Sequence, residues 1–134
     1  MPGEFLDTNV LVYTLASDPE KAGRARRLIV AGGTISVQVL NEAANVPRRK
    51  RAMEWPDITA WLSVLRESLT VVPVTVETHD LGLWLAERHC LSPFDAMIVA
   101  AAVLADCDTL WSEDMHDGLV VLGRVRIVNP FRSP

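Results

Sequence analysis

Apolar residues along this chain follow two different patterns, and the two alternate. Short runs rich in apolar and β-branched residues predict β-strands, whereas apolar residues that recur every three to four positions predict one face of an α-helix. The predicted strands cover residues 4–6, 34–37, 70–76, 109–111, 120–122 and 125–128. The predicted helices cover residues 9–16, 19–32, 38–51, 57–68, 77–89 and 93–105, with a polar loop or single turn at 112–118.

Strands that alternate with helical segments of this length are typical of a parallel β-sheet with helices on both faces. We therefore predict an α/β fold, without a defined strand order. Two prolines modify the elements. Pro47 is expected to kink or break the helix over 38–51, because it lacks a backbone donor and clashes with the preceding turn. Pro73 indicates that the strand over 70–76 lies at a sheet edge or is divided in two.

Four of the seventeen acidic residues follow predicted strands or lie in the first turns of the helices after them: Asp7, Glu42, Asp95 and Asp114. In an open parallel sheet, the carboxyl ends of the strands line the ligand crevice, so these side chains can meet at one edge. Two like charges about 4 Å apart repel by about 4 kcal/mol at an effective dielectric constant of about 20. A divalent cation removes that cost, and ligands that are all oxygen favour Mg²⁺ or Mn²⁺ over zinc.

Each of these acids also has a purely structural interpretation. Asp7 and Asp95 lie where a carboxylate caps a helix N-terminus. Glu42 suits a solvated helix face, while Asp114 and Asp117 suit a turn. Only the joint pattern favours a site.

Composition and charge restrict the class of protein. A chain of 134 residues that is 49% hydrophobic is expected to form a single compact domain. Its net charge of −4 means that a polyanion would need a local basic patch. The densest basic run is Arg48, Arg49, Lys50 and Arg51. These residues can contact phosphates, or they can form a solvated helix end that complements the helix dipole.

No export signal or membrane-spanning segment is expected. The longest apolar run, residues 96–105, is shorter than the roughly 20 residues that a membrane helix needs. Cys90 and Cys107 are not in a metal-ligand spacing with the histidines, so free thiols in an intracellular protein are expected. Trp61 and Trp84 lie on apolar helix faces, whereas Trp55 is expected in a turn between helices, where it can contact a partner.

Four segments, in order, resemble a PIN domain, and specifically a VapC-type toxin of a bacterial or archaeal toxin–antitoxin pair. They are Phe5–Asn9, Ser36–Glu42, Leu91–Ala102 and Leu110–Met115. The resemblance implies a Rossmann-like three-layer α/β/α fold with a mainly parallel central sheet. It also implies a Mg²⁺- or Mn²⁺-dependent ribonuclease that leaves a 5′-phosphate and a 3′-hydroxyl.

The resemblance assigns roles to individual residues by their position in these segments. The acidic quartet carries over to Asp7, Glu42, Asp95 and Asp114. We expect Asp7, Asp95 and Asp114 to bind the metal ion directly or through water, and Glu42 to position the attacking water or a second ion. Asn9 and Ser112 match polar positions that support the quartet, and Asp117 lies where some relatives carry an additional acid.

The same resemblance implies partners: an RNA substrate, a second copy of the chain, and a VapB-type antitoxin that covers the active-site groove. We expect a cytoplasmic prokaryotic protein that contacts neither membrane nor DNA. A non-catalytic PIN fold that binds RNA or protein remains the main alternative. A haloacid-dehalogenase-type phosphatase would need an acid where Asn9 stands, and a receiver domain would need a lysine beyond Lys50, the last in this chain.

Overall fold

The computed structural model describes residues 3–132 and contains one mainly parallel β-sheet. Its strands are β1 (Gly3–Leu6), β2 (Gly33–Ser36), β3 (Leu69–Val72), β4 (Cys107–Trp111), β5 (Val120–Val121) and β6 (Val125–Val128). The strand order is β3-β2-β1-β4-β6-β5, and β5 alone pairs antiparallel with its neighbour. The predicted parallel sheet is confirmed, and its order places β1 in the centre.

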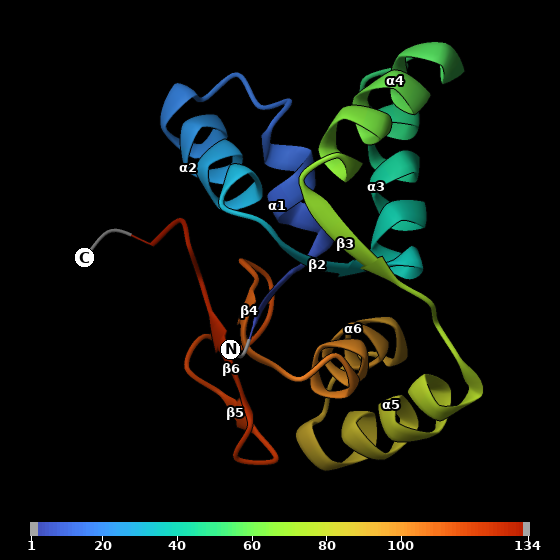
Figure 1. The fold of residues 1–134 in the computed structure, drawn as a ribbon, viewed down its shortest axis with the longest axis vertical. Coiled ribbons are helices and arrows are strands. Elements are labelled where there is room, and N and C mark those ends of the chain that lie inside the picture. Colours follow the sequence, from blue (N-terminus) through green and yellow to red (C-terminus); the bar gives the residue numbers. More distant parts are fainter. Residues whose placement is uncertain (1–2, 133–134) are drawn as a thin grey trace.

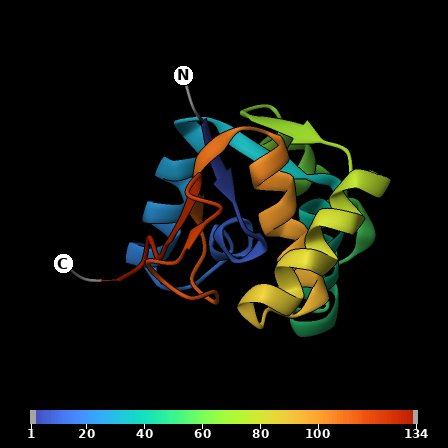
Figure 2. The ribbon, with the colours of Figure 1, turned by 90° about the horizontal axis from the view of Figure 1, so that it is seen from below.

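Helices cover both faces of the sheet, as Figure 1 shows. On one side lie α1 (Thr8–Tyr13), α2 (Pro19–Val30), α3 (Val37–Lys50) and α4 (Trp55–Arg66), and on the other lie α5 (Val76–His89) and α6 (Pro93–Leu104). The view from below in Figure 2 shows α5 and α6 packed side by side. The three-layer α/β/α fold predicted from the sequence is therefore confirmed.

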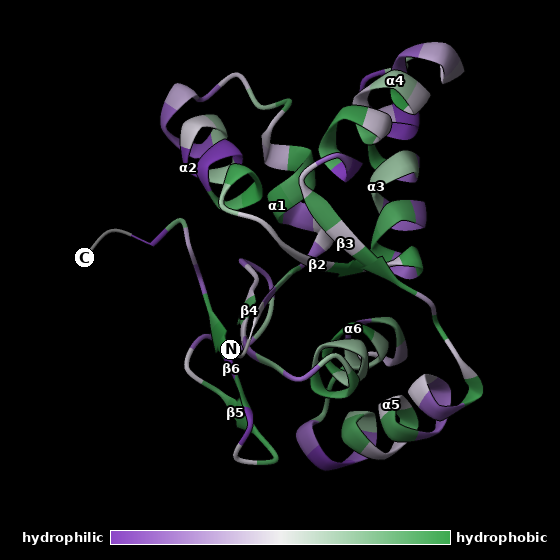
Figure 3. Cartoon of the chain, viewed as in Figure 1, coloured by the Kyte–Doolittle hydropathy of each residue, from purple (hydrophilic) through white to green (hydrophobic). Residues whose placement is uncertain are grey.

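The core lies between the sheet and the helices on either face. Strands β1, β4 and β6 contribute Phe5, Leu6, Leu110 and Ile127, all with no exposed surface. Figure 3 shows hydrophilic and hydrophobic residues alternating around α2 and α3, as expected of helices with one buried face, whereas α6 is mainly apolar. Seven of the twelve residues of α6 are buried, because this helix packs between α5 and the sheet.

Two predictions about the segment joining α3 to α4 are wrong. Pro47 does not break α3 as predicted, because the helix continues for about one more turn, to Lys50. The missing amide of Pro47 leaves out one helical hydrogen bond, whereas its buried ring packs in the interior and its carbonyl accepts from the Arg51 amide at 3.0 Å. Trp55 begins α4 instead of lying in a turn, since Pro56 is well suited to the first turn of a helix.

The edge-strand prediction for the region around Pro73 is confirmed. β3 ends at Val72 and lies at the edge of the sheet, so Pro73 interrupts no ladder. Cys90 and Cys107 are both free thiols. Among residues 3–132, no helix is long and apolar enough to cross a membrane.

Candidate active site

The carboxyl ends of the two central strands bring Asp7 and Ser112 together. Leu6 of β1 pairs with Trp111 of β4, and the Asp7 amide donates to the Trp111 carbonyl at 3.0 Å. Since each strand ends at this point, the next residue of each is free to turn its side chain toward the other. The Ser112 hydroxyl donates to Asp7 Oδ2 at 2.7 Å.

Asp7 is a nearly buried carboxylate, with 4% of its surface exposed. Its Oδ1 accepts the Thr8 amide at 2.7 Å, so Asp7 also caps α1, as its structural interpretation predicted. Burial raises the pKa of Asp7 to about 6; the hydrogen bonds from Ser112 and Thr8 oppose this rise, and the charges of Asp95 and Asp114 add to it. The Asp7 side chain therefore caps α1 and also belongs to the acidic cluster.

Asn9 connects two of the predicted acids. Its Nδ2 donates to Asp114 Oδ2 at 3.2 Å and to Asp7 Oδ2 at 3.4 Å. Its Oδ1 accepts the amide of Glu113 at 3.4 Å, which holds the loop after β4 against α1. Asn9 thus contacts two of the predicted acids, whereas Ser112 contacts Asp7.

The other two acids come from helices in opposite layers. Glu42 lies on α3, and its carboxylate accepts from the Thr8 hydroxyl at 3.5 Å and from Gln38 Nε2 at 2.9 Å. Asp95 lies in the first turn of α6, where its amide donates to the capping Ser92 hydroxyl at 3.2 Å. Burial raises the pKa of Asp95, with a smaller rise from the charge of Asp114 and an opposing effect of Ser92.

All four predicted acids line one pocket of about 740 Å³ between α1, α3, α6 and the loop after β4. Its wall also contains Thr8, Tyr13, Asn45 and Glu113, to which no sequence pattern assigns a role. The structure therefore brings Asp7, Glu42, Asp95 and Asp114 together with Asn9, although they are scattered along the chain.

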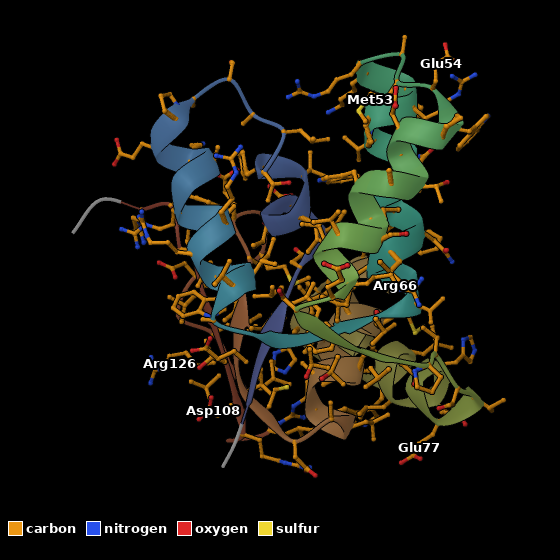
Figure 4. All side chains as sticks on the ribbon, turned by 45° about the horizontal axis from the view of Figure 1, so that its top comes forward. Met53, Glu54, Arg66, Glu77, Asp108 and Arg126 are labelled. Carbon is orange, nitrogen blue, oxygen red and sulfur yellow. The ribbon has the colours of Figure 1, made fainter. Side chains whose placement is uncertain are left out.

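The four basic residues at the end of α3 do not all face the pocket. Lys50 and Arg51 line the pocket, while Arg48 and Arg49 are not among its lining residues. Arg48 donates to the Met53 carbonyl at 3.1 Å and lies 4.9 Å from the ring centroid of Trp55. Figure 4 shows Met53, in the loop between α3 and α4, far from Asp108 at the other end of the molecule.

Asp117 lies outside the pocket and holds the C-terminal segment. Its Oδ1 accepts the Asn129 amide at 2.8 Å, and its Oδ2 pairs with Arg132 at 2.6 Å. These two interactions hold the pKa of Asp117 below its ordinary value. The possible additional acid thus has a structural role here.

Sequence reasoning missed a polar cluster beside the acids. Tyr13 donates its hydroxyl to Glu113, whose other oxygen pairs with Lys21 Nζ at 3.0 Å. The Lys21 ammonium also lies 4.6 Å from the Tyr13 ring centroid. Burial raises the pKa of Tyr13, and its hydrogen bond to Glu113 adds to the rise. No sequence pattern indicates this cluster, because Tyr13 fits the apolar periodicity of its helix and Lys21 belongs to a different helix.

The donor set is compatible with a hydrated divalent cation. Within residues 3–132, no three His, Cys, Asp or Glu side chains form a ready-made cage for a metal ion. Mg²⁺ does not require one, because it commonly keeps several waters and binds through one or two carboxylates. The available donors are carboxylate oxygens, and the charges of Asp95 and Asp114 add to the larger effect of burial in raising the pKa of Asp7.

The PIN domain profile matches residues 5–116 of this chain. The chain belongs to the PIN domain family. The matched range contains the four acids, Asn9 and Ser112, and leaves out Asp117. A search of curated protein sequences finds no match.

Solved structures similar to this PIN domain include toxins and toxin–antitoxin complexes. A toxin–antitoxin complex from Klebsiella pneumoniae matches with a TM-score of 0.70 and 20% identity, over 97% of this chain and 99% of that one. The sarcin–ricin loop cleaving toxin VapC20 from Mycobacterium tuberculosis matches with a TM-score of 0.67 and 20% identity, over 83% of this chain and 89% of that one. DNA-bound VapBC from Salmonella typhimurium matches with a TM-score of 0.63 and 20% identity, over 95% of this chain and 97% of that one. At these identities the likeness shows a shared fold.

Proposed function

We propose that this PIN domain is a metal-dependent ribonuclease and the VapC-type toxin of a toxin–antitoxin pair. The observation that carries the proposal is the pocket at the carboxyl ends of β1 and β4, where acids from separate elements face one space. Lys50 and Arg51 line the same space, so cations for phosphate binding stand next to the carboxylates. A phosphodiester substrate would use both.

The division of labour follows from the surroundings of each acid. Asp7, Asp95 and Asp114 would hold a Mg²⁺ or Mn²⁺ ion, directly or through water. When bound, such an ion stabilises charge on the phosphate oxygens and lowers the pKa of a coordinated water. Glu42, which is fixed by Thr8 and Gln38, would orient the attacking water or hold a second ion. Asn9 and Ser112 keep Asp7 and Asp114 in place.

The partners proposed for this chain are an antitoxin of VapB type and a second copy of the chain. The similar structures include VapBC of Rickettsia felis and of Salmonella typhimurium, each bound to DNA, which supports an antitoxin partner. In our proposal DNA contact belongs to the antitoxin, and the complex acts in the prokaryotic cytoplasm.

A non-catalytic RNA-binding or protein-binding PIN fold is the alternative, and the acids argue against it. A surface that only binds RNA gains nothing from a buried carboxylate among further acids, because each repels phosphate. Asp7 is nearly buried in this position at the expense of its own ionisation. Such an arrangement is useful where a cation is bound.

The decisive experiment compares RNA cleavage by the purified protein with that by its Asp7→Asn variant, in Mg²⁺ or Mn²⁺ and in excess chelator. We expect cleavage by the wild type with metal only, and a loss of at least about 100-fold in the variant, as is typical when one electrostatic contact to a reacting group is removed. The matched control is Asp108→Asn, which changes an exposed acid near the start of β4 (Figure 4). Equal cleavage by Asp7→Asn and wild type would refute the proposal.

A further inference from the structure

Gln38 in the first turn of α3 makes two hydrogen bonds with one amide group. Its Nε2 donates to Glu42 Oε2 at 2.9 Å and to the Phe94 carbonyl at 2.7 Å. Both partners are pure acceptors, which requires the nitrogen of the side-chain amide at this position. A primary amide has two N–H bonds, so both are used.

The two acceptors belong to different layers of the fold. Glu42 lies one turn further along α3, on one side of the sheet, while Phe94 belongs to α6 on the other side (Figure 1). Phe94 is followed directly by Asp95. Gln38 therefore spans the carboxyl edge of the sheet and joins the helix that carries Glu42 to the turn that carries Asp95.

The Glu42 carboxylate has one other donor, and that contact is weaker. The Thr8 hydroxyl reaches Glu42 Oε1 at 3.5 Å, which is at the limit of a hydrogen bond. Glu42 has a long side chain in a partly exposed position, so packing restricts its rotamers less than it would in the core. The shorter bond from Gln38 is the contact that selects one orientation of the carboxylate toward the pocket.

We infer that Gln38 is a positioning residue of the active site, which sets the Glu42 carboxylate and the first turn of α6 relative to each other. Gln38 is absent from the pocket lining, and its hydrogen bonds go to Glu42 and to the carbonyl of Phe94 next to Asp95, so its proposed effect passes through these two acids. The inference rests on the proposed ribonuclease function, and it adds a residue to which no catalytic pattern in the sequence points.

The first test replaces Gln38 with methionine, which keeps the length of the side chain and removes both donors. We expect kcat for RNA cleavage to fall about tenfold with KM changed by less than about twofold, because a hydrogen bond to a charged group is lost without loss of a substrate contact. Asn41→Ala is the matched control, since Asn41 is an exposed amide on the same helix and lies outside the pocket lining. Its kcat should equal that of the wild type.

The second test separates positioning from a general effect on folding. In a Glu42→Gln background, Gln38→Met should lower kcat by clearly less than tenfold, because only its effect through the turn that carries Asp95 remains. The same variants are titrated with Mn²⁺ by calorimetry. Changes to residues that orient ligands typically weaken metal binding by about 10- to 100-fold, and we expect Gln38→Met to weaken it by about tenfold.

The possible outcomes distinguish the two claims. A wild-type protein without metal-dependent cleavage refutes the ribonuclease proposal, and this inference with it. An active wild type whose Gln38→Met variant matches it in kcat and Mn²⁺ affinity refutes the inference alone, as does a full tenfold loss in the Glu42→Gln background. If Gln38→Met does not fold, Gln38→Asn replaces it, because its shorter amide cannot span both acceptors.

Discussion

Asp7 is the acid of the site whose ionised form is most disfavoured by burial. Its carboxylate is almost fully buried, near the charges of Asp95 and Asp114, and the hydrogen bonds from Ser112 and Thr8 favour its ionised form. The pKa of about 6 compares with an ordinary value of 3.8, which at 1.36 kcal/mol per pKa unit corresponds to about 3 kcal/mol. Charged Asp7 therefore destabilises the metal-free fold.

This cost predicts a pH-dependent stability difference between wild type and Asp7→Asn. Between the ordinary pKa and the raised one, the folded wild type holds a proton that the unfolded chain has released, so its stability falls as pH rises. The amide cannot ionise and avoids that loss. We expect the free energy of unfolding of Asp7→Asn, relative to wild type, to increase by about 2 kcal/mol from about pH 4.5 to about pH 7.5.

Urea unfolding of both metal-free proteins at the two pH values measures this difference. Other titrating groups are common to both chains and largely cancel. Asp108→Asn, which removes the same charge from an exposed position, is the control for the change in net charge. A difference that stays constant with pH would mean that the pKa of Asp7 is not raised in the folded protein.

At the scale of elements, the position of Asp95 depends on how closely α6 packs against α5. Gly82 of α5 faces Met97 of α6, and a Cβ at Gly82 would lie 3.3 Å from the Met97 Cα and 3.0 Å from its Cε. Met97 lies two residues after Asp95, so a displacement of α6 at this contact also moves the acid. The glycine allows the two helices to approach closely.

Gly82→Ala is therefore expected to destabilise the fold by about 1–3 kcal/mol, the usual cost of overpacking in an interior. Gly23→Ala is the matched control, because Gly23 lies on α2 and an added Cβ would meet only the end of the Arg27 side chain at 3.7 Å. Helix propensity alone predicts a gain of up to about 1 kcal/mol there. Thermal unfolding measures both, and a stabilised Gly82→Ala would contradict the close packing of α5 on α6.

At the scale of the whole molecule, net charge works against an RNA substrate. The chain carries a charge of −4, and the pocket adds a concentration of carboxylates. Binding of RNA therefore depends on cations that lie at the pocket itself. Lys50 and Arg51 meet this condition. The Arg48 side chain instead donates a hydrogen bond to the Met53 carbonyl and lies over the Trp55 ring.

Replacing Lys50 and Arg51 with glutamine should weaken RNA binding and reduce its salt dependence. Each lost phosphate contact lowers the slope of log K against log salt by about 0.7 on single strands, so the double variant should lose about 1.4. The Arg48→Gln/Arg49→Gln pair removes the same charge and should keep most of the slope. Binding is measured in the Asp7→Asn background, and equal slopes for the two pairs would show that long-range charge alone attracts the RNA.

The elements of this protein and the location of its acids follow from local rules that a sequence displays. Strand and helix periodicities predicted the α/β class, and Asp7 and Asp95 were found because caps and strand ends are defined by neighbours in the chain. The errors were local too: Pro47 lies so near the end of α3 that a lost hydrogen bond could not stop the helix.

Only the tertiary structure decided which side chains meet. The pairing of Gln38 with the Phe94 carbonyl, the cluster of Tyr13, Lys21 and Glu113, and the separation of Lys50 from Arg48 depend on how helices are rotated and how layers are placed. Those quantities are set by packing between segments far apart in the chain, and no local pattern encodes them. The sequence therefore determined which acids belong near a strand end, and the fold determined what holds each one in place.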